Sequence, residues 1–156
     1  MKKFSLVVFL FATIAGNAQS RTMNSTSYQT ALGVKIWDGG GITLKHFVAP
    51  NKAAEAIAYF YNRGIRFTGL YEIHFDISGA PGLKWYVGPG AHIGFYNDKF
   101  RRENRAVLGI DGVLGLDYKF NTAPINLSLD WQPSIEFASG FGFNGNWGGL
   151  GIRYTF

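Results

Sequence analysis

The chain has 156 residues, no cysteine and a formal net charge of +5, with 16% charged and 17% aromatic residues. So small a basic surplus gives no case for nucleic-acid binding, and the lack of cysteine excludes a disulfide scaffold and any cysteine-ligated metal site. Soluble domains carry about 25% charged residues, so this composition is typical of a protein whose surface is not fully wetted.

Residues 1–18 have the pattern of a secretory signal peptide. Lys2 and Lys3 precede an apolar run over 4–15, and Gly16-Asn17-Ala18 forms a small-residue cleavage site. The apolar run is too short for a membrane-spanning helix, although a short membrane anchor is the alternative. Without this segment the chain keeps 13 basic and 10 acidic residues. Residues 19–27 then form a short polar periplasmic lead-in, and residues 28–156 form the folded domain.

Eight alternating segments follow, and turn residues separate them. Segment 53–61 is ambiguous because its alanine-rich start could open a helix. The aromatic run at 59–61 and the turn at 62–64 favour a strand. The predicted strands are residues 28–37, 41–48, 53–61, 65–75, 83–95, 106–120, 125–137 and 146–156.

Segment 125–137 carries the strongest signal. Apolar residues occupy every second position from Ile125 to Phe137, and polar residues occupy the positions between them. Such alternation places one face of a strand in an apolar medium and the other in a polar one. Globular strands average five or six residues, whereas a tilted membrane-spanning strand needs about nine to eleven. The sequence therefore predicts an all-β fold, an eight-stranded antiparallel up-and-down transmembrane β-barrel.

An even number of strands places both chain ends on one side of the membrane, which in bacterial barrels is the periplasm. The turns at 49–52, 76–82 and 121–124 are then periplasmic. The connections at 38–40, 62–64, 97–104 and 139–145 face outward. Because an open sheet leaves backbone groups unpaired in lipid, segment 146–156 must close against segment 28–37.

Alternation alone does not say which face points inward. A soluble lipocalin-like barrel buries its apolar face, whereas a membrane barrel exposes it. Large aromatic residues near the strand ends and an apolar face almost free of charge favour the membrane arrangement. Glycines on the polar face also suit a narrow lumen; they are Gly88, Gly90, Gly94, Gly109, Gly115, Gly149 and Gly151.

An eight-stranded barrel is only wide enough for side chains to fill it. The charges on the polar face are therefore expected to form an interior plug, with a narrow diffusion channel as the alternative. The predicted lumen network is Lys35, Arg66, Glu72, Lys84, Asp111, Asp117, Asp130, Glu136 and Arg153; Lys45, Glu55, Asp76 and Lys119 share the same face. Tight pairing across 121–124 and 97–104 places Asp117 opposite both Ser128 and Lys84, and predicts a Lys84–Asp117 contact inside the barrel.

The chain resembles the small eight-stranded outer-membrane proteins of the OmpA-transmembrane-domain and OmpX type. Its most specific part is the ending 149–156, which looks like the C-terminal assembly signal of such barrels, with Gly151, Tyr154 and Phe156 in place. Gly149 departs from the polar residue that usually begins this signal. The junction Asn17-Ala18-Gln19-Ser20 looks like those of Bacteroidetes outer-membrane proteins. The resemblance implies insertion by the barrel assembly machinery into the outer membrane of a Gram-negative bacterium.

Three histidines raise the question of catalysis. Some small outer-membrane barrels are lipid A deacylases or acyltransferases, a chemistry that requires a histidine beside a serine nucleophile and oriented by a carboxylate. The chain contains no His-x-Ser arrangement, and Glu72 and His74 share a face with no serine beside them. The sequence therefore predicts no catalytic residue, no cofactor and no metal site. A lipid-modifying enzyme is the alternative.

The basic connection at 97–105 is a candidate contact for lipopolysaccharide phosphates through Lys99, Arg101, Arg102 and Arg105. A solvated charged loop explains it equally well. The predicted function is a non-catalytic, porin-like envelope protein with a structural or interaction role. The expected partners are outer-membrane lipids, lipopolysaccharide and an unidentified envelope protein.

Overall fold

The structure is a computed structural model that describes residues 28–62, 64–98, 103–137 and 142–156, and it leaves the side chains of 97–98 and 103–105 undescribed. The predicted signal peptide at 1–18 and the lead-in at 19–27 therefore lie outside the described residues. No helix in the described part of the chain is long and apolar enough to cross a bilayer.

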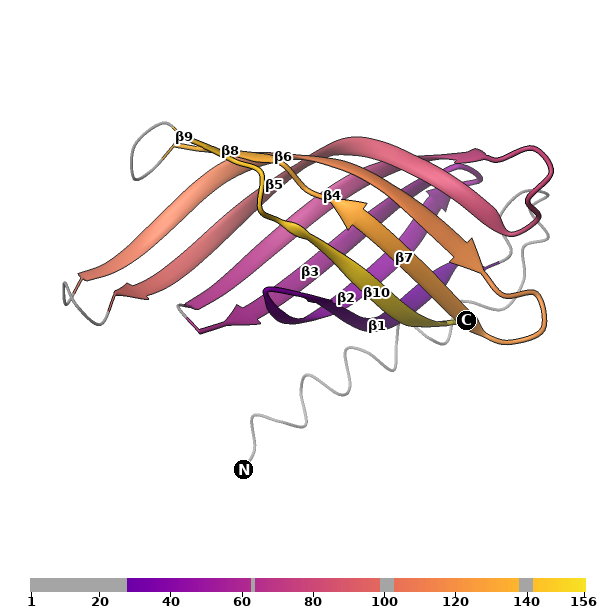
Figure 1. Cartoon of the computed structure of the whole chain (residues 1–156), viewed down its shortest axis with the longest axis horizontal. Coiled ribbons are helices and arrows are strands. Elements are labelled where there is room, and N and C mark those ends of the chain that lie inside the picture. Colours follow the sequence, from indigo (N-terminus) through magenta and orange to yellow (C-terminus); the bar gives the residue numbers. More distant parts are fainter. Residues whose placement is uncertain (1–27, 63, 99–102, 138–141) are drawn as a thin grey trace, which may run out of the picture.

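The described residues form a closed antiparallel barrel (Figure 1). From β1 to β6 each strand pairs with the next along the chain, and β8 pairs with β6 and β9. Strand β10 pairs with both β7 and β1, which closes the sheet. Segments β7 and β8 together make the seventh wall strand, and β9 and β10 make the eighth. The strands are β1 (Thr30–Trp37), β2 (Gly39–Ala49), β3 (Lys52–Tyr61), β4 (Gly64–Asp76), β5 (Leu83–Asp98), β6 (Glu103–Lys119), β7 (Ile125–Trp131), β8 (Ser134–Glu136), β9 (Gly142–Asn144) and β10 (Gly148–Thr155). The predicted eight-stranded antiparallel up-and-down barrel is confirmed.

The predicted registers are also confirmed. Lys84 lies opposite Asp117, and Asp117 lies opposite Ser128 on the next strand. At the barrel seam, Ala31 pairs with Thr155. Short hairpins have a register set by turn length, which is why the sequence was sufficient here.

The structure differs from the predicted strand boundaries at three places. Segment 125–137 is interrupted at Gln132-Pro133, because proline has no N–H to donate to a ladder. The wall continues across the interruption, since the Gln132 N–H donates to the Trp147 carbonyl and the Gly112 N–H donates to the Pro133 carbonyl, both at 2.8 Å. The predicted connection at 97–104 is shorter than expected because the β5–β6 ladder extends to the Asp98–Glu103 pair. Strand β9 likewise lies within the connection predicted at 139–145.

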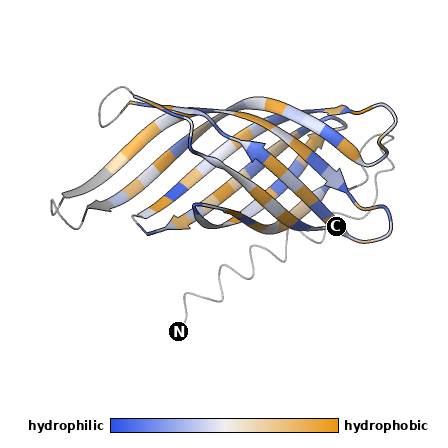
Figure 2. Cartoon of the chain, in the orientation of Figure 1, coloured by the Kyte–Doolittle hydropathy of each residue, from blue (hydrophilic) through white to orange (hydrophobic). Residues whose placement is uncertain are grey.

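The two faces of the wall differ sharply in burial. Lys35 and Arg66 are fully buried inside, whereas the apolar side chains of Leu114 and Leu129 are about half exposed outside. Hydrophobic and hydrophilic residues alternate along the strands in Figure 2. The polar face therefore lines the lumen and the apolar face points outward, which contradicts the lipocalin-like arrangement.

Aromatic side chains collect on the outside at the end of the barrel that carries the C-terminus. Phe75 stacks on Trp85 with ring centroids 4.4 Å apart, and Tyr118 packs edge-on against Phe120 at 4.8 Å. Tyr154 and Phe156 form a third pair at 5.9 Å. We call these six residues the aromatic belt.

Candidate functional site: the polar lumen

Arg153 on β10 is the centre of the lumen network. Its guanidinium donates hydrogen bonds to Asn126 Oδ1 at 3.1 Å and to Ser128 Oγ at 2.7 Å, and forms an ion pair with Glu55 on β3. A further bond from Nε reaches Thr43 Oγ1 at 3.2 Å. Arg153 thus joins side chains from β2, β3, β7 and its own strand, β10, and all of them are buried.

Lys35 and Asp130 form the second cluster, which is continuous with the first. The Lys35 ammonium lies 2.6 Å from Asp130 and 3.4 Å from Glu55. The Tyr86 hydroxyl and the Gln132 side-chain amide donate to the two carboxylate oxygens of Asp130 at 2.6 and 2.7 Å. Asp130 therefore has a partner on each oxygen in addition to its ion pair.

Lys45 connects the network to the end of the barrel that carries the C-terminus. Its ammonium lies 2.8 Å from Glu72 and 3.2 Å from Asp117, and 4.3 Å from the centre of the Tyr86 ring. Lys84 lies opposite Asp117 in the strand register, as predicted, whereas the predicted contact between their side chains stays a prediction. Lys84 also forms an ion pair with Asp76 at 3.1 Å at the barrel rim, where the Asp76 carboxyl is 77% exposed. Asp76 was expected in the lumen but faces solvent, because β4 ends at that residue.

A separate charged layer lies toward the opposite end. Arg66 forms an ion pair with Asp111 at 2.6 Å, and His92 Nδ1 lies 2.9 Å from the same carboxylate. The Trp147 ring covers the Arg66 guanidinium at 4.2 Å. Leu70 lies between Arg66 and Glu72 along β4, and Val113 lies between Asp111 and Asp117 along β6; with Ile57, Tyr59 and Tyr86 they form a buried apolar cluster, which we call the apolar layer. The lumen is therefore filled in layers, and Trp147 covers the outer one.

The structure places the predicted lumen residues in two groups. Lys84 and Glu136 are half-buried, near opposite ends of the barrel. The buried group is Lys35, Arg66, Glu72, Asp111, Asp117, Asp130 and Arg153. The nominated network omitted Lys45 and Glu55, which connect its parts. Lys119, expected in the lumen, donates to the carbonyls of Phe120 and Ala123 in the hairpin turn.

The apolar layer was missed by sequence reasoning. Ile57, Leu70 and Val113 lie at positions whose parity matches the polar face, but their side chains are apolar. Trp147 has the same parity as Gly149 and Arg153 on its strand. Because these residues occupy the same alternate positions as the polar side chains, the alternating pattern could have identified them as facing the lumen.

Each histidine has a polar partner. His74 Nε2 lies 2.9 Å from Glu72 Oε2, and His46 Nδ1 lies 2.8 Å from Thr30 Oγ1. Across the ranges that the structure covers, none of the three histidines hydrogen-bonds to a serine, and no group of three His, Cys, Asp or Glu side chains is arranged to hold a metal ion.

The other nominated residues lie outside the lumen network or beyond the described side chains. Tyr154 and Phe156 are about half exposed in the aromatic belt, whereas Gly151 is buried beside Ser128 and Arg153. Arg105 pairs through its backbone with Tyr96. Its side chain, and all of Lys99, Arg101 and Arg102, lie outside the described residues.

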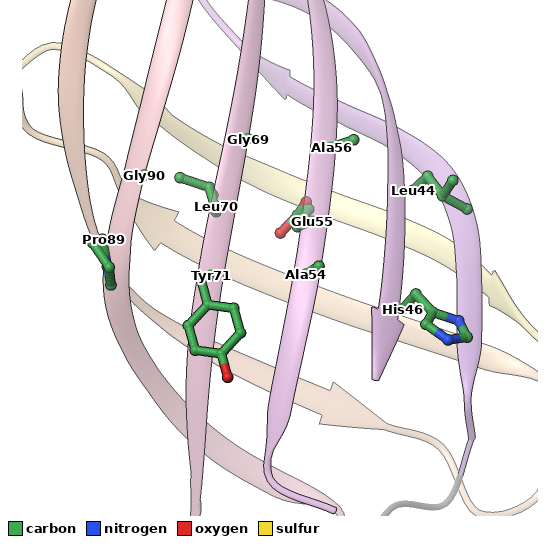
Figure 3. Close-up of a pocket in the computed structure, with 10 residues that line it drawn as sticks. All are labelled: Leu44, His46, Ala54, Glu55, Ala56, Gly69, Leu70, Tyr71, Pro89 and Gly90. Atoms are coloured by element: carbon green, nitrogen blue, oxygen red, sulfur yellow. The ribbon is translucent and has the colours of Figure 1, made fainter. Parts of the chain in front are cut away.

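The outer wall has an apolar hollow of about 530 Å³ across β2–β5 (Figure 3). Ala54, Ala56 and Gly69 form its floor, with His46 on one side and Tyr71 on the other. Small residues on three neighbouring positions leave the wall thin there. The hollow therefore lies on the outer face of the barrel, the face that also carries the exposed side chains of Leu114 and Leu129.

Comparison of the chain with protein-family models, curated proteins and solved structures gives no match.

Proposed function

We propose that this chain is a small outer-membrane β-barrel of a Gram-negative bacterium, of the OmpA-transmembrane-domain or OmpX type. It is exported with residues 1–18 as a cleaved signal peptide and inserted by the barrel assembly machinery. Its role is structural or interactive in the envelope, without catalysis. Lipids of the outer membrane surround it, and an envelope protein is its expected partner.

The observation that carries this proposal is the orientation of the wall. Large apolar side chains such as Leu114, Leu129 and Ile152 are exposed around the barrel, while lysines, arginines and carboxylates are buried inside. A monomeric soluble protein rarely exposes apolar patches beyond a few hundred Å². A bilayer accepts such a surface and accepts a closed barrel, because antiparallel ladders pair the backbone groups of each strand with both neighbours and leave no open sheet edge.

The lumen supports a sealed barrel over a diffusion channel. Arg153, Lys45 and Trp147 reach across the interior and contact strands far away in sequence. An eight-stranded barrel leaves no room for a water-filled channel beside such side chains. The histidines favour a non-catalytic protein, since none of the three hydrogen-bonds to a serine among the described residues.

The proposal is tested by refolding residues 19–156 into detergent micelles and into lipid vesicles. The expected product is rich in β-structure, migrates faster on a gel before boiling than after it, and remains in the membrane fraction of cells that express it. A monodisperse protein that needs no detergent would overturn the membrane assignment.

Conductance in a planar bilayer separates the sealed barrel from the channel. We expect no steady current, and a steady ohmic current would support the channel. Mass spectrometry of lipid A from cells with and without the protein distinguishes the enzyme, which alone would change the acylation pattern.

A further inference from the structure

A second hollow, of about 450 Å³, lies at the end of the barrel away from the C-terminus. Four separate parts of the chain meet there: Asp38 between β1 and β2, Asn62 just after β3, Tyr96 on β5, and the stretch that connects β9 to β10. A site assembled from several hairpins at one barrel mouth is a typical position for ligand binding. We call it the mouth pocket.

The walls of the mouth pocket are aromatic. Tyr61 packs against Tyr96 with ring centroids 5.7 Å apart, and against Trp147 at 5.4 Å. The Trp147 ring also packs against the Arg66 guanidinium, 4.2 Å from the ring centre, and against the Tyr59 ring, with centroids 5.5 Å apart. Because each ring is held by another side chain, the walls are formed before any ligand arrives, which lowers the entropy cost of binding.

The remaining lining side chains are three amides and one carboxylate. Asn144 Oδ1 accepts from the Asn146 N–H at 3.0 Å, and the Trp37 indole donates to the Asn146 carbonyl at 2.9 Å, so this backbone is fixed. Within the described part of the chain, the side chains of Asn62, Asn146 and Asp38 make no hydrogen bond. Their donors and acceptors are therefore available to a ligand.

The aromatic walls and the available amide groups together indicate which class of ligand the mouth pocket would bind. An amide both donates and accepts, which matches a hydroxyl group that does the same. Aromatic faces suit a ligand with an apolar C–H surface. Among the described residues, the lining contains no lysine or arginine to attract an anion, and Asp38 repels one. We propose that the mouth pocket binds a neutral saccharide unit. This inference goes beyond the proposed envelope role and needs only the folded barrel.

The test uses residues 19–156 refolded in lauryldimethylamine oxide, since detergents with sugar head groups would compete. Glucose, galactose, N-acetylglucosamine and maltose are titrated one at a time and followed by saturation-transfer NMR. We expect saturable, millimolar binding of at least one of these sugars. Tyr96→Ala removes one wall and should weaken that binding about tenfold or more. The matched control Tyr118→Ala removes a ring from the aromatic belt and should leave binding unchanged.

A cationic ligand is the competing class, because aromatic rings beside a carboxylate also attract ammonium groups. Tetramethylammonium is therefore titrated in parallel. Asp38→Asn should weaken sugar binding by a smaller factor than Tyr96→Ala does, since an amide still pairs with hydroxyls. Gel mobility before and after boiling checks that each variant is folded. The proposal is overturned if none of the four sugars saturates, if a folded Tyr96→Ala binds them as well as the parent, or if only tetramethylammonium binds.

Discussion

Arg153 on the last wall strand forms an ion pair across the lumen with Glu55 on the third, although 98 positions separate them in the chain. Both side chains are buried, and Lys35 and Lys45 lie close to the same carboxylate. The pair joins two strands that β1 and β2 separate in the wall, and breaking it leaves charge unpaired in the interior.

Glu55→Ala should lower the free energy of unfolding by about 3–5 kcal/mol, because a buried cation loses its partner. Urea titration of protein refolded in vesicles measures it. The matched control is the double variant Glu55→Leu, Arg153→Met, which removes both charges and should cost less than the two single changes together. Additive costs would mean that the two side chains do not interact in solution.

Leu129→Arg should lower the free energy of unfolding by about 2–4 kcal/mol if the residue lies near the middle of a bilayer. Leu116 lies opposite Leu129 on β6, so Leu116→Arg should lower the free energy of unfolding by a similar amount. The same titration in vesicles gives the value, with Leu129→Ala as the control for lost packing. Should arginine be tolerated at both positions while Asp117→Asn unfolds the barrel, the outer face is not in lipid.

Gly151→Ala should destabilise the barrel by about 1–3 kcal/mol, since an added methyl group overpacks the lumen. Its Cβ would meet Ser128 Oγ at 2.5 Å and the Arg153 guanidinium carbon at 3.2 Å. Gly40→Ala is the matched control, because its Cβ would meet no atom within 4 Å. Equal unfolding midpoints for the two variants would show that the lumen has spare room beside Arg153.

Deletion of Phe156 should reduce the amount of protein in the outer membrane far more than it reduces the stability of refolded protein. The terminal ring adds one exposed side chain to the aromatic belt, whereas the assembly machinery is expected to recognise it. Quantitative blotting of membrane fractions and urea titration measure the two effects. Phe120→Ala, from the same belt, controls for the loss of a ring. Unchanged membrane levels would argue against an assembly signal.

Arg101→Gln with Arg102→Gln should weaken binding to vesicles that contain lipopolysaccharide, and more so at low salt, because each arginine can pair with a phosphate. Lys52→Gln removes an exposed charge at the opposite barrel end and serves as the control. If each arginine removed lowered vesicle binding only as much as Lys52→Gln does, residues 99–102 would be a solvated loop and not a lipopolysaccharide contact.

The sequence alone determined the wall of this protein. Alternation set the number and parity of the strands, and short turns set the registers that place Lys84 opposite Asp117. These are local properties, because neighbouring hairpin strands pair over a few residues and side chains alternate with a period of two. The interruption at Pro133 could also have been read from the missing N–H.

Only the tertiary structure decided what the wall encloses. Alternation is symmetrical between the two faces, so closure of β10 on β1 was needed to show that the polar face is inside. The partners of a lumen side chain come from across the barrel. Lys45 meets Asp117, 72 positions away, and Trp147 covers Arg66. Such contacts depend on the curvature of the closed sheet and on side-chain length, and no local pattern in the chain encodes them.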